Sequence, residues 1–386
     1  MTTTTRPRVL VIEPFAPHSF LARIWAEALT DAGAEVRVTA WDTSVRTTST
    51  TPWRGDIDLD VSCASSGVRR PLSRLWITWH YGRQAVRIRA KVRDLLRTFD
   101  ADCVLVTTAL STDFLGLALA RTRGITVAVV HGPPSGGRMA SYALRRFAGE
   151  PASARGQYLG CMTDRLQGRY LGAGAHSERV LVVPEWLTSR TVAATADGQG
   201  PVSFIGEARA DKGFDWLASA APSLAQTGLV RIQAYVNTER QLRREATAGL
   251  LDASYPGLEV IPGKLEGREY RRLLETSAAI LLPYDPEEYG LGRISAILPE
   301  AWASGVPVLV SDGWWAADLV REYGGGYIFK YGETASLVEA VWKLRSTHSA
   351  CSAQAKAAYD QLLATRGPTV FARRLMALAE ASSPRQ

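Results

Sequence analysis

Two basic side chains follow directly after a short apolar run in the middle of the chain. The segment reads F-I-G-E-A-R-A-D-K-G-F, in which Gly206 ends the run and Arg209, Lys212 and Gly213 follow. An arginine binds a diphosphate through two parallel hydrogen bonds, and a lysine adds a point charge. If a helix begins at Gly213, the N–H groups of its first turn also favour an anion. These residues predict a diphosphate site, although two solvated charges in a loop would have the same spacing.

A carboxylate follows a glycine-containing stretch in residues 286–309. This segment reads P-E-E-Y-G-L-G-R-I-S-A-I-L-P-E-A-W-A-S-G-V-P-V-L, and Glu300 heads its Ala-rich part, which ends at Gly305. A charge at a helix terminus would account for the residue. Alternatively, Glu300 faces a ligand and accepts hydrogen bonds from both hydroxyls of a ribose, as an acidic residue does in dinucleotide-binding folds. Pro299 fits the first turn of a helix, where its missing N–H costs little.

Polar side chains in the first half of the chain also follow apolar runs. His131 comes between V-A-V-V and G-P-P-S-G-G, and the turn P-F-A-P-H-S after the first run contains His18 and Ser19. Ligands bind at the carboxyl ends of parallel strands. We therefore expect His131 at the ligand-binding edge, and His18 and Ser19 beside a second substrate or a phosphate. A lone histidine is more often structural, so the prediction for His131 rests on its position at the end of a strand.

Short apolar runs alternate with helical patterns along the whole chain. The runs are apolar throughout, which is typical of buried parallel strands. Parallel strands need crossover connections, and the helical patterns supply them. The sequence therefore predicts an α/β fold with two Rossmann-like, doubly wound parallel-sheet domains that face each other across a cleft. The expected strands are 9–12, 35–41, 104–108, 126–130, 180–183, 202–206, 230–236, 258–261, 279–284, 306–310 and 327–329.

A small, polar segment without apolar periodicity separates the two halves. It covers residues 188–200 and reads as a linker. We expect an N-terminal acceptor domain over 1–187 and a C-terminal donor domain over 201–365. The last helical pattern, within 366–386, is expected to cross back to the N-terminal domain.

The overall composition is that of a globular protein that binds anions. Apolar residues make up 46% and charged residues 22%, and the net charge is +7, which favours phosphorylated, lipid or other anionic partners. No apolar run is long enough for a membrane span, and the N-terminus lacks a secretory pattern. The four cysteines are far apart and lack metal-ligand spacing. A reduced, cytoplasmic protein without a bound metal is expected.

Much of the excess positive charge lies in residues 69–97. Arginines and one lysine alternate there with apolar residues at helical spacing, which predicts an amphipathic helix with a basic face. Such a helix either packs against its own domain or also contacts an anionic membrane surface. The segment has no nucleic-acid motif, so we expect no nucleic-acid partner.

The two motifs of the second half resemble those of the retaining GT-B glycosyltransferases of the family-4 type. Those proteins carry a G-x-x-R-x-x-K-G element for the donor diphosphate and an E-A-x-x-x-G-x-P-V element for the ribose. The matching residues here are Gly206, Arg209, Lys212 and Gly213, and then Glu300, Ala301, Gly305, Pro307 and Val308. The resemblance implies a GT-B fold, Arg209 and Lys212 on the diphosphate, and Glu300 on the ribose. It also implies that His131 contacts the donor sugar.

One position departs from the family pattern. Many members have a second glutamate eight residues before the ribose-binding one, and Gly292 occupies that position here. The sequence R-I-S-A-I-L-P-E is similar to a subset with R-x-S-G-x-x-x-E. The backbone N–H groups of Ser295, Ala296 and Ile297 are then expected to bind the sugar, with Arg293 near the donor or bracing the loop.

The sequence thus predicts an enzyme that moves a sugar from a nucleoside-diphosphate sugar, with UDP or GDP as the carrier, to an acceptor. The resemblance implies retention of the anomeric configuration and no cofactor. Natural products, glycans and lipid-linked sugars remain open as acceptors, and the Arg- and Ala-rich composition is typical of a bacterial protein. The D-x-D pattern in residues 56–60 lies far from the diphosphate residues and is not assigned to a metal.

Two other functions remain open from the sequence. A sugar-nucleotide epimerase would use the same fold but would need acid and base residues beside His131. A non-catalytic protein that binds membranes or polyanions would use the basic helix in residues 69–97 and would not bind a nucleotide.

Overall fold

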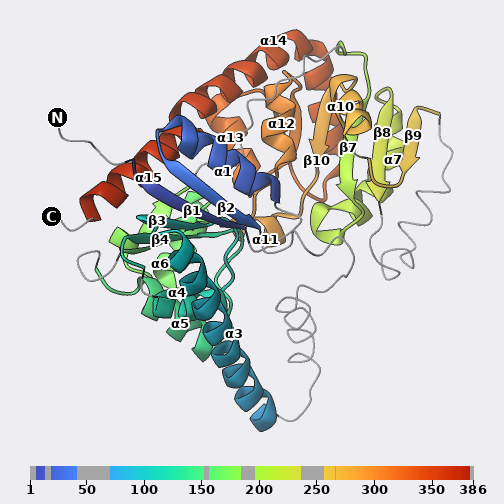
Figure 1. Ribbon diagram of the computed structural model, residues 1–386. Coiled ribbons are helices and arrows are strands. Elements are labelled where there is room, and N and C mark those ends of the chain that lie inside the picture. Colours follow the sequence, from blue (N-terminus) through green and yellow to red (C-terminus); the bar gives the residue numbers. More distant parts are fainter. Residues whose placement is uncertain are drawn as a thin grey trace. The chain divides into compact units, whose positions relative to one another are not determined.

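The structure is a computed structural model that describes residues 6–13, 19–40, 70–120, 122–151, 156–183, 196–235, 256–265 and 267–382 (Figure 1). The chain divides into two compact units. Unit 1 contains residues 1–184 and 366–386, and unit 2 contains residues 185–365. Most of the predicted linker, His18 and the D-x-D pattern lie outside the described residues.

Unit 1 is built on a six-stranded parallel sheet. The strand order is β2-β1-β3-β4-β5-β6, and every neighbouring pair is parallel. The prediction of an α/β fold with doubly wound parallel sheets is therefore confirmed for this half. The strands are β1 (Arg8–Glu13), β2 (Glu35–Ala40), β3 (Cys103–Val106), β4 (Ile125–Val130), β5 (Gln157–Cys161) and β6 (Val180–Val182).

The sequence analysis missed β5. Its sequence, Q-Y-L-G-C, places a glutamine and a glycine in a short strand and so breaks the apolar run. Gly160 allows close packing here, because a Cβ at this position would lie 2.5 Å from Cγ2 of Val183. Packing against the neighbouring segment, rather than β propensity, explains this strand.

Helices cover both faces of this sheet. Ile12, Val106 and Val130 pack against α3, α4, α5 and α6 on one face. The opposite face is covered by α1 and α15, whose Trp25 and Phe371 rings lie 5.0 Å apart, so the C-terminal helix belongs to unit 1. The helices are α1 (Ser19–Asp31), α3 (Arg70–Thr98), α4 (Asp113–Ala120), α5 (Arg138–Ala148), α6 (Asp164–Gly172) and α15 (Pro368–Ser382).

Unit 2 contains a second six-stranded parallel sheet, in the order β12-β11-β10-β7-β8-β9. Its strands β7, β8, β10 and β11 are largely buried, which explains their mainly apolar sequences. The strands are β7 (Val202–Glu207), β8 (Val230–Tyr235), β9 (Leu258–Pro262), β10 (Ala279–Leu282), β11 (Val308–Ser311) and β12 (Gly326–Phe329). The helices are α7 (Phe214–Ala225), α10 (Arg268–Glu275), α11 (Pro286–Tyr289), α12 (Ile297–Ala303), α13 (Trp315–Tyr323) and α14 (Thr334–Arg366). Among the described residues of both units, no helix is long and apolar enough to cross a bilayer.

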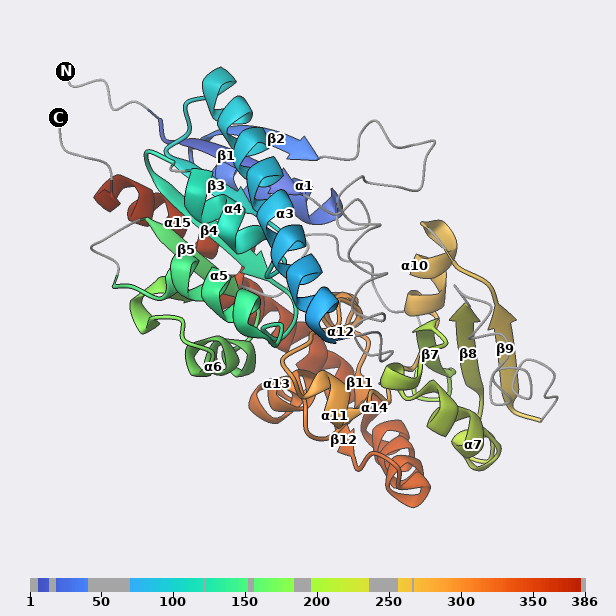
Figure 2. The ribbon, with the colours of Figure 1, turned by 90° about the horizontal axis from the view of Figure 1, so that it is seen from below.

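The strand order reverses once in each sheet. In unit 1 the reversal lies between β1 and β3, and in unit 2 it lies between β7 and β10. Crossover connections run to opposite sides at such a point, which leaves a crevice outside the carboxyl ends of the strands where ligands bind. Figure 2 shows β7, β8 and β9 side by side in unit 2. The candidate residues of both units are therefore considered first at these two reversal points.

Candidate functional site

The loop after β7 begins at the reversal point of unit 2. A short 3-10 turn, Ala210–Lys212, links β7 to α7. Gly213 ends this turn with φ +70°, and a Cβ there would lie 1.7 Å from the carbonyl oxygen of Pro283. Only glycine fits this left-handed, closely packed position. The backbone N–H of Asp285 also donates to the carbonyl of Asp211 at 3.0 Å, so the loops after β7 and β10 are fastened together.

Two arginines from these loops share one carboxylate. Arg209 donates from Nε and Nη2 to the two oxygens of Asp211, at 2.8 and 2.7 Å. Arg293 donates from Nη1 to Oδ2 of the same carboxylate at 3.0 Å. A guanidinium held by two parallel hydrogen bonds has a fixed plane. Asp211 therefore orients both arginines at the reversal point, and its hydrogen bond to Arg293, 82 positions away, completes one cationic cluster of Arg209, Arg293 and the adjacent Lys212.

The electrostatic environment keeps Arg209 charged. Burial by itself would lower its pKa, but the hydrogen bonds to Asp211, together with nearby Tyr289 and Glu207, raise the pKa overall. Its Nη2 also donates to the hydroxyl of Tyr289 at 3.2 Å, and Nη1 lies 3.5 Å from Oε2 of Glu207. The side chain is still 36% exposed, so a ligand can reach it.

Lys212 differs from the two arginines because its ammonium has no acidic partner. The ammonium makes no hydrogen bond or ion pair with any residue that the structure describes, and Nζ lies 5.7 Å from the centre of the Tyr284 ring. Burial lowers the pKa of Lys212, and the nearby charge of Arg209 lowers it further. Such an ammonium is costly in the free protein, and an anionic ligand would stabilise it. A Cβ at Gly206 would lie 3.1 Å from Nζ, so this glycine leaves room for the lysine.

Three aromatic rings lie beneath the cationic cluster. The centroids of Tyr284 and Tyr289 are 4.5 Å apart, and Trp314 lies 4.9 and 5.2 Å from them. All three residues are buried, and burial raises the pKa of Tyr284 to about 12. The tyrosines therefore stay neutral at physiological pH. The rings form a rigid support for the loop that carries Arg293, whose guanidinium lies 5.8 Å from the Tyr289 ring.

Glu300 lies on α12 and is held by a tyrosine from another helix. The hydroxyl of Tyr270, on α10, donates a short hydrogen bond to Oε2 of Glu300. Burial raises the pKa of Glu300, while this hydrogen bond lowers it. The pKa of Tyr270 is raised by burial and by the adjacent carboxylate, so its hydroxyl remains a donor. This arrangement fixes one carboxylate oxygen, and Tyr270 is a partner of the candidate residue Glu300 that the sequence analysis did not identify.

The segment before α12 holds the other predicted sugar-binding residues. Ala296 precedes the helix and Ile297 begins it, and the hydroxyl of buried Ser295 lies 3.4 Å from that of Tyr284. Gly292 has φ +101°, a conformation that a glutamate adopts only with strain. The backbone therefore gives a physical reason for the departure from the family pattern at this position.

A polar cluster occupies the reversal point of unit 1. Glu13 ends β1 and is 1% exposed, and its Oε2 accepts hydrogen bonds from the hydroxyls of Thr107, at 2.5 Å, and Thr108, at 3.0 Å. His131 follows β4, and its Nε2 lies 2.7 Å from the carbonyl oxygen of Thr107. A carbonyl only accepts, so Nε2 carries a proton. His131 thus lies at the carboxyl edge, as expected, whereas only the backbone of Ser19, the first residue of α1, is described.

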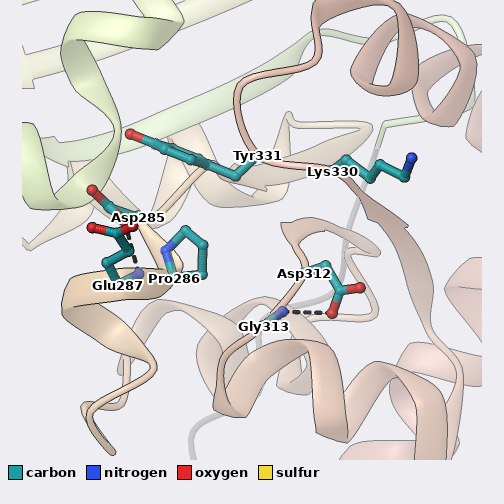
Figure 3. Close-up of a pocket in the computed structure, with 7 residues that line it drawn as sticks. All are labelled: Asp285, Pro286, Glu287, Asp312, Gly313, Lys330 and Tyr331. Carbon is teal, nitrogen blue, oxygen red and sulfur yellow. Dashed lines mark hydrogen bonds between the residues drawn. The ribbon is translucent and has the colours of Figure 1, made fainter.

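An open groove of about 560 Å³ lies at the carboxyl ends of β10, β11 and β12 (Figure 3). Tyr331 points toward Asp285 and Glu287 across it, whereas Lys330 points away from them. The groove is mainly acidic and contains none of the predicted diphosphate or ribose residues. Its lining residues are Asp285, Pro286, Glu287, Asp312, Gly313, Lys330 and Tyr331.

A family comparison matches the part of the chain that carries the cationic cluster. Residues 200–347, which include β7 to β12, match the family described as Glycosyl transferases group 1. No curated protein matches the sequence significantly. The matched range contains Arg209, Lys212, Tyr270 and Glu300.

Solved structures resemble both units. HepE from Anabaena, solved in complex with UDP, is 14% identical over 97% of this chain and 100% of its own, with a TM-score of 0.63. Sucrose-phosphate synthase from Thermosynechococcus elongatus is 11% identical over 97% of this chain and 99% of its own, with a TM-score of 0.65. TarM is 11% identical over 75% of this chain, which spans only 58% of TarM, with a TM-score of 0.58. Both the matched domain and these folds support a glycosyltransferase. The chain has the GT-B fold with two Rossmann-like domains, and residues 200–347 in its second unit match the model of the glycosyl transferases group 1 family.

Proposed function

We propose that the protein transfers a sugar from a nucleoside-diphosphate sugar to an acceptor, with retention of the anomeric configuration. The observation that carries this proposal is the position of Lys212. Its ammonium is half-buried, has no acidic partner among the described residues, and lies beside Arg209 at the reversal point of unit 2. A diphosphate would supply the missing negative charge at the place where ligands of such sheets bind.

In this proposal the donor is held by residues of unit 2. Arg209 and Lys212 bind the diphosphate, Gly206 leaves space for it, and Glu300 accepts hydrogen bonds from the ribose. As the carbon–oxygen bond to the leaving group breaks, negative charge grows on the diphosphate. Preorganised cations at that position stabilise the transition state more than the ground state. This role requires no metal, and UDP or GDP is the carrier that we propose; the HepE structure contains UDP.

We propose that the remaining candidate residues contact the transferred sugar and the acceptor. We assign sugar contacts to Arg293 and to the backbone of Ser295, Ala296 and Ile297, and a further contact to His131. Because Arg293 shares Asp211 with Arg209, its guanidinium is also close to the proposed diphosphate. We propose that Ser19 and His18 contact the acceptor. We also propose that the protein acts in the cytoplasm. The acceptor class is a glycan, a natural product or a lipid-linked sugar, and front-face attack on the anomeric carbon would retain configuration.

The direct test is transfer itself. The protein is incubated with UDP- and GDP-sugars and with acceptors of the three classes, while release of nucleoside diphosphate is followed. The anomeric proton coupling in the NMR spectrum of the product then reports the configuration. Consumption of one donor with an unchanged anomeric configuration supports the proposal. Conversion of the nucleotide sugar to its epimer without an acceptor would show that the protein is an epimerase. A product with inverted anomeric configuration would contradict the proposed retention.

Tyr270→Phe is expected to raise the KM for the donor roughly 10-fold, since a hydrogen bond to a charged group contributes about 1.5–3 kcal/mol. The ring remains, but Glu300 loses the donor that fixes its position. The same hydrogen bond lowers the pKa of Glu300, so its removal raises that pKa further. The acid limb of kcat/KM should therefore move to higher pH. Steady-state kinetics across a pH series measure both effects.

Tyr327→Phe is the matched control for this variant. The hydroxyl of Tyr327 lies 2.9 Å from Oγ1 of Thr347, an exposed pair outside the proposed site. It should leave the KM and the acid limb unchanged. An unchanged acid limb in Tyr270→Phe would show that Glu300 is not the group that titrates, and would remove its assignment to the ribose.

A further inference from the structure

One face of α3 packs in unit 1 and the opposite face is exposed. Tyr81, Ile88 and Val92 are buried in the core of this unit. This packed, apolar face of α3 is therefore used within unit 1 and is not available to bind a membrane or another protein. The N-terminal turns of α3 extend beyond α4 and α5 (Figure 1).

The exposed face of α3 carries apolar residues that do not belong to the hydrophobic core of the unit. Trp79 is 56% exposed and Val86 is 65% exposed, the two highest exposed fractions among the large apolar side chains that the structure describes. At 100° per residue they lie within about 20° of each other on the helix surface. Ala90 continues the same stripe and is also exposed. Exposed apolar side chains in a row on one helix indicate a contact surface.

Basic side chains flank this apolar stripe. The guanidinium of Arg83 lies 5.2 Å from the centre of the Trp79 ring, and Arg97 lies on the same line of the helix. The exposed basic residues of the described part are Arg83, Arg89, Lys91, Arg93 and Arg97, and Asp94 is the acid among them. A tryptophan and a valine surrounded by arginines match an anionic lipid interface, because the rings enter the headgroup region while the guanidinium groups contact phosphates. A nucleic acid would use the charges but not the valine.

The contacts of Tyr81, on the packed face of α3, show which end of the helix lies at the carboxyl edge of the unit 1 sheet. The Tyr81 hydroxyl lies 3.3 Å from Oγ of Ser111, which follows β3. Ser111 in turn donates to Oγ of Ser135 at 2.8 Å, and Ser135 follows β4. The N-terminal half of α3 thus lies at the carboxyl edge of the sheet, the edge that also carries His131.

We infer that the exposed face of α3 docks on the surface of a membrane rich in anionic phospholipids. The face is defined by Trp79, Arg83, Val86, Ala90 and Arg97, and exposed Arg89 lies at its border. It holds the carboxyl edge of the unit 1 sheet next to the lipid headgroups. The inference goes beyond the proposed function, and it extends that function in one respect: an acceptor anchored in the membrane would meet the edge proposed to bind it.

The test is flotation of the full-length protein with vesicles, in the absence of any sugar donor. The wild-type protein should float with vesicles of phosphatidylcholine and 30% phosphatidylglycerol and should not float with phosphatidylcholine alone. Each basic residue near an anionic surface contributes roughly fivefold to the binding constant. The triple variant Arg83→Glu, Arg89→Glu, Arg97→Glu should therefore lose on the order of 100-fold or more in vesicle affinity.

Two further variants separate lipid docking from a general effect of charge. The control variant Lys356→Glu, Arg373→Glu, Arg374→Glu makes the same charge change on exposed positions of α14 and α15 and should float like the wild type. Trp79→Ser with Val86→Ser keeps every charge and should lose most of the binding. If the control loses as much as the α3 triple variant, net charge alone accounts for the binding and the inference fails.

The remaining outcomes decide between lipids and other polyanions. Absence of wild-type binding to the anionic vesicles overturns the inference. So does full binding by Trp79→Ser, Val86→Ser, particularly if heparin displaces the protein equally well from both forms, because the face would then recognise charge alone. Nucleotide binding, measured by thermal unfolding with UDP and GDP, reports separately on the proposed function, so each claim can fail without the other.

Discussion

Lys212→Met is expected to lower kcat for sugar transfer by on the order of 10²–10³-fold, the usual effect of removing one group that stabilises transition-state charge. The free protein should be at least as stable as the wild type. The ammonium has no acidic partner among the described residues, and burial lowers its pKa, so it destabilises the fold when no ligand is bound. Methionine keeps the length and packing of the side chain. A gain or no change in Tm together with a loss of activity would identify a residue kept for function.

Lys343→Met is the matched control for this substitution. Lys343 is exposed on α14, and its Nζ lies 2.7 Å from Oε1 of Glu339. This change should leave kcat unaltered and cost little stability, because water screens an exposed ion pair. Differential scanning calorimetry and initial rates measure both quantities. If Lys212→Met retains wild-type kcat, the diphosphate does not contact this ammonium and the proposed donor site is wrong.

Glu300→Gln is expected to weaken binding of the nucleotide donor roughly 10- to 100-fold, the loss for hydrogen bonds to a charged group. The substitution should also remove the pH dependence of donor binding that arises from the titration of Glu300. Burial raises the pKa of Glu300, so the folded protein binds this proton more tightly than the unfolded chain does. The resulting stabilisation is present at low pH and is lost as the pH rises through the raised pKa. Ribose hydroxyls donate to the charged form, so donor binding should strengthen over that same rise in pH.

Titration calorimetry with the nucleotide sugar measures this linkage. The wild-type protein should release a proton on binding near the raised pKa of Glu300, and Glu300→Gln should not. Glu339→Gln, an exposed carboxylate on α14, is the control and should behave like the wild type. Identical pH profiles for the wild type and Glu300→Gln would contradict the assignment of Glu300 to the ribose.

The sequence predicted the fold well because the central strands are buried. Their nearly continuous apolar runs, such as 126–130 and 306–310, stand out against amphipathic helices. β5 was missed because Gln157 and Gly160 interrupt its apolar run, and the strand depends on packing against Val183. Propensity carries no information about such a contact between distant segments.

The sequence indicated where the candidate residues lie along the chain, but it did not indicate which side chains contact one another. Arg209 and Lys212 were found from the glycines around them and their place after an apolar run. The sharing of Asp211 by Arg209 and Arg293 depends on loops that are 82 positions apart and meet only in the folded sheet. Tyr270 was missed for the same reason, since it comes from α10 while Glu300 lies on α12. The buried Glu13 could have been suspected, because it directly follows the first apolar run and so ends a predicted strand.

The most direct test of the proposed donor site is thermal unfolding with UDP and GDP, on the wild type, Lys212→Met and Glu300→Gln. A ligand at 100 times its Kd stabilises the folded protein by about 2.7 kcal/mol. In a unit of this size, that corresponds to a rise in Tm of several degrees. We predict that one of the two nucleotides produces this rise in the wild type and that both variants show about half of it or less at the same nucleotide concentration. If neither nucleotide raises the Tm of the wild type at millimolar concentration, the cationic cluster at the reversal point of unit 2 is not a nucleotide-sugar site.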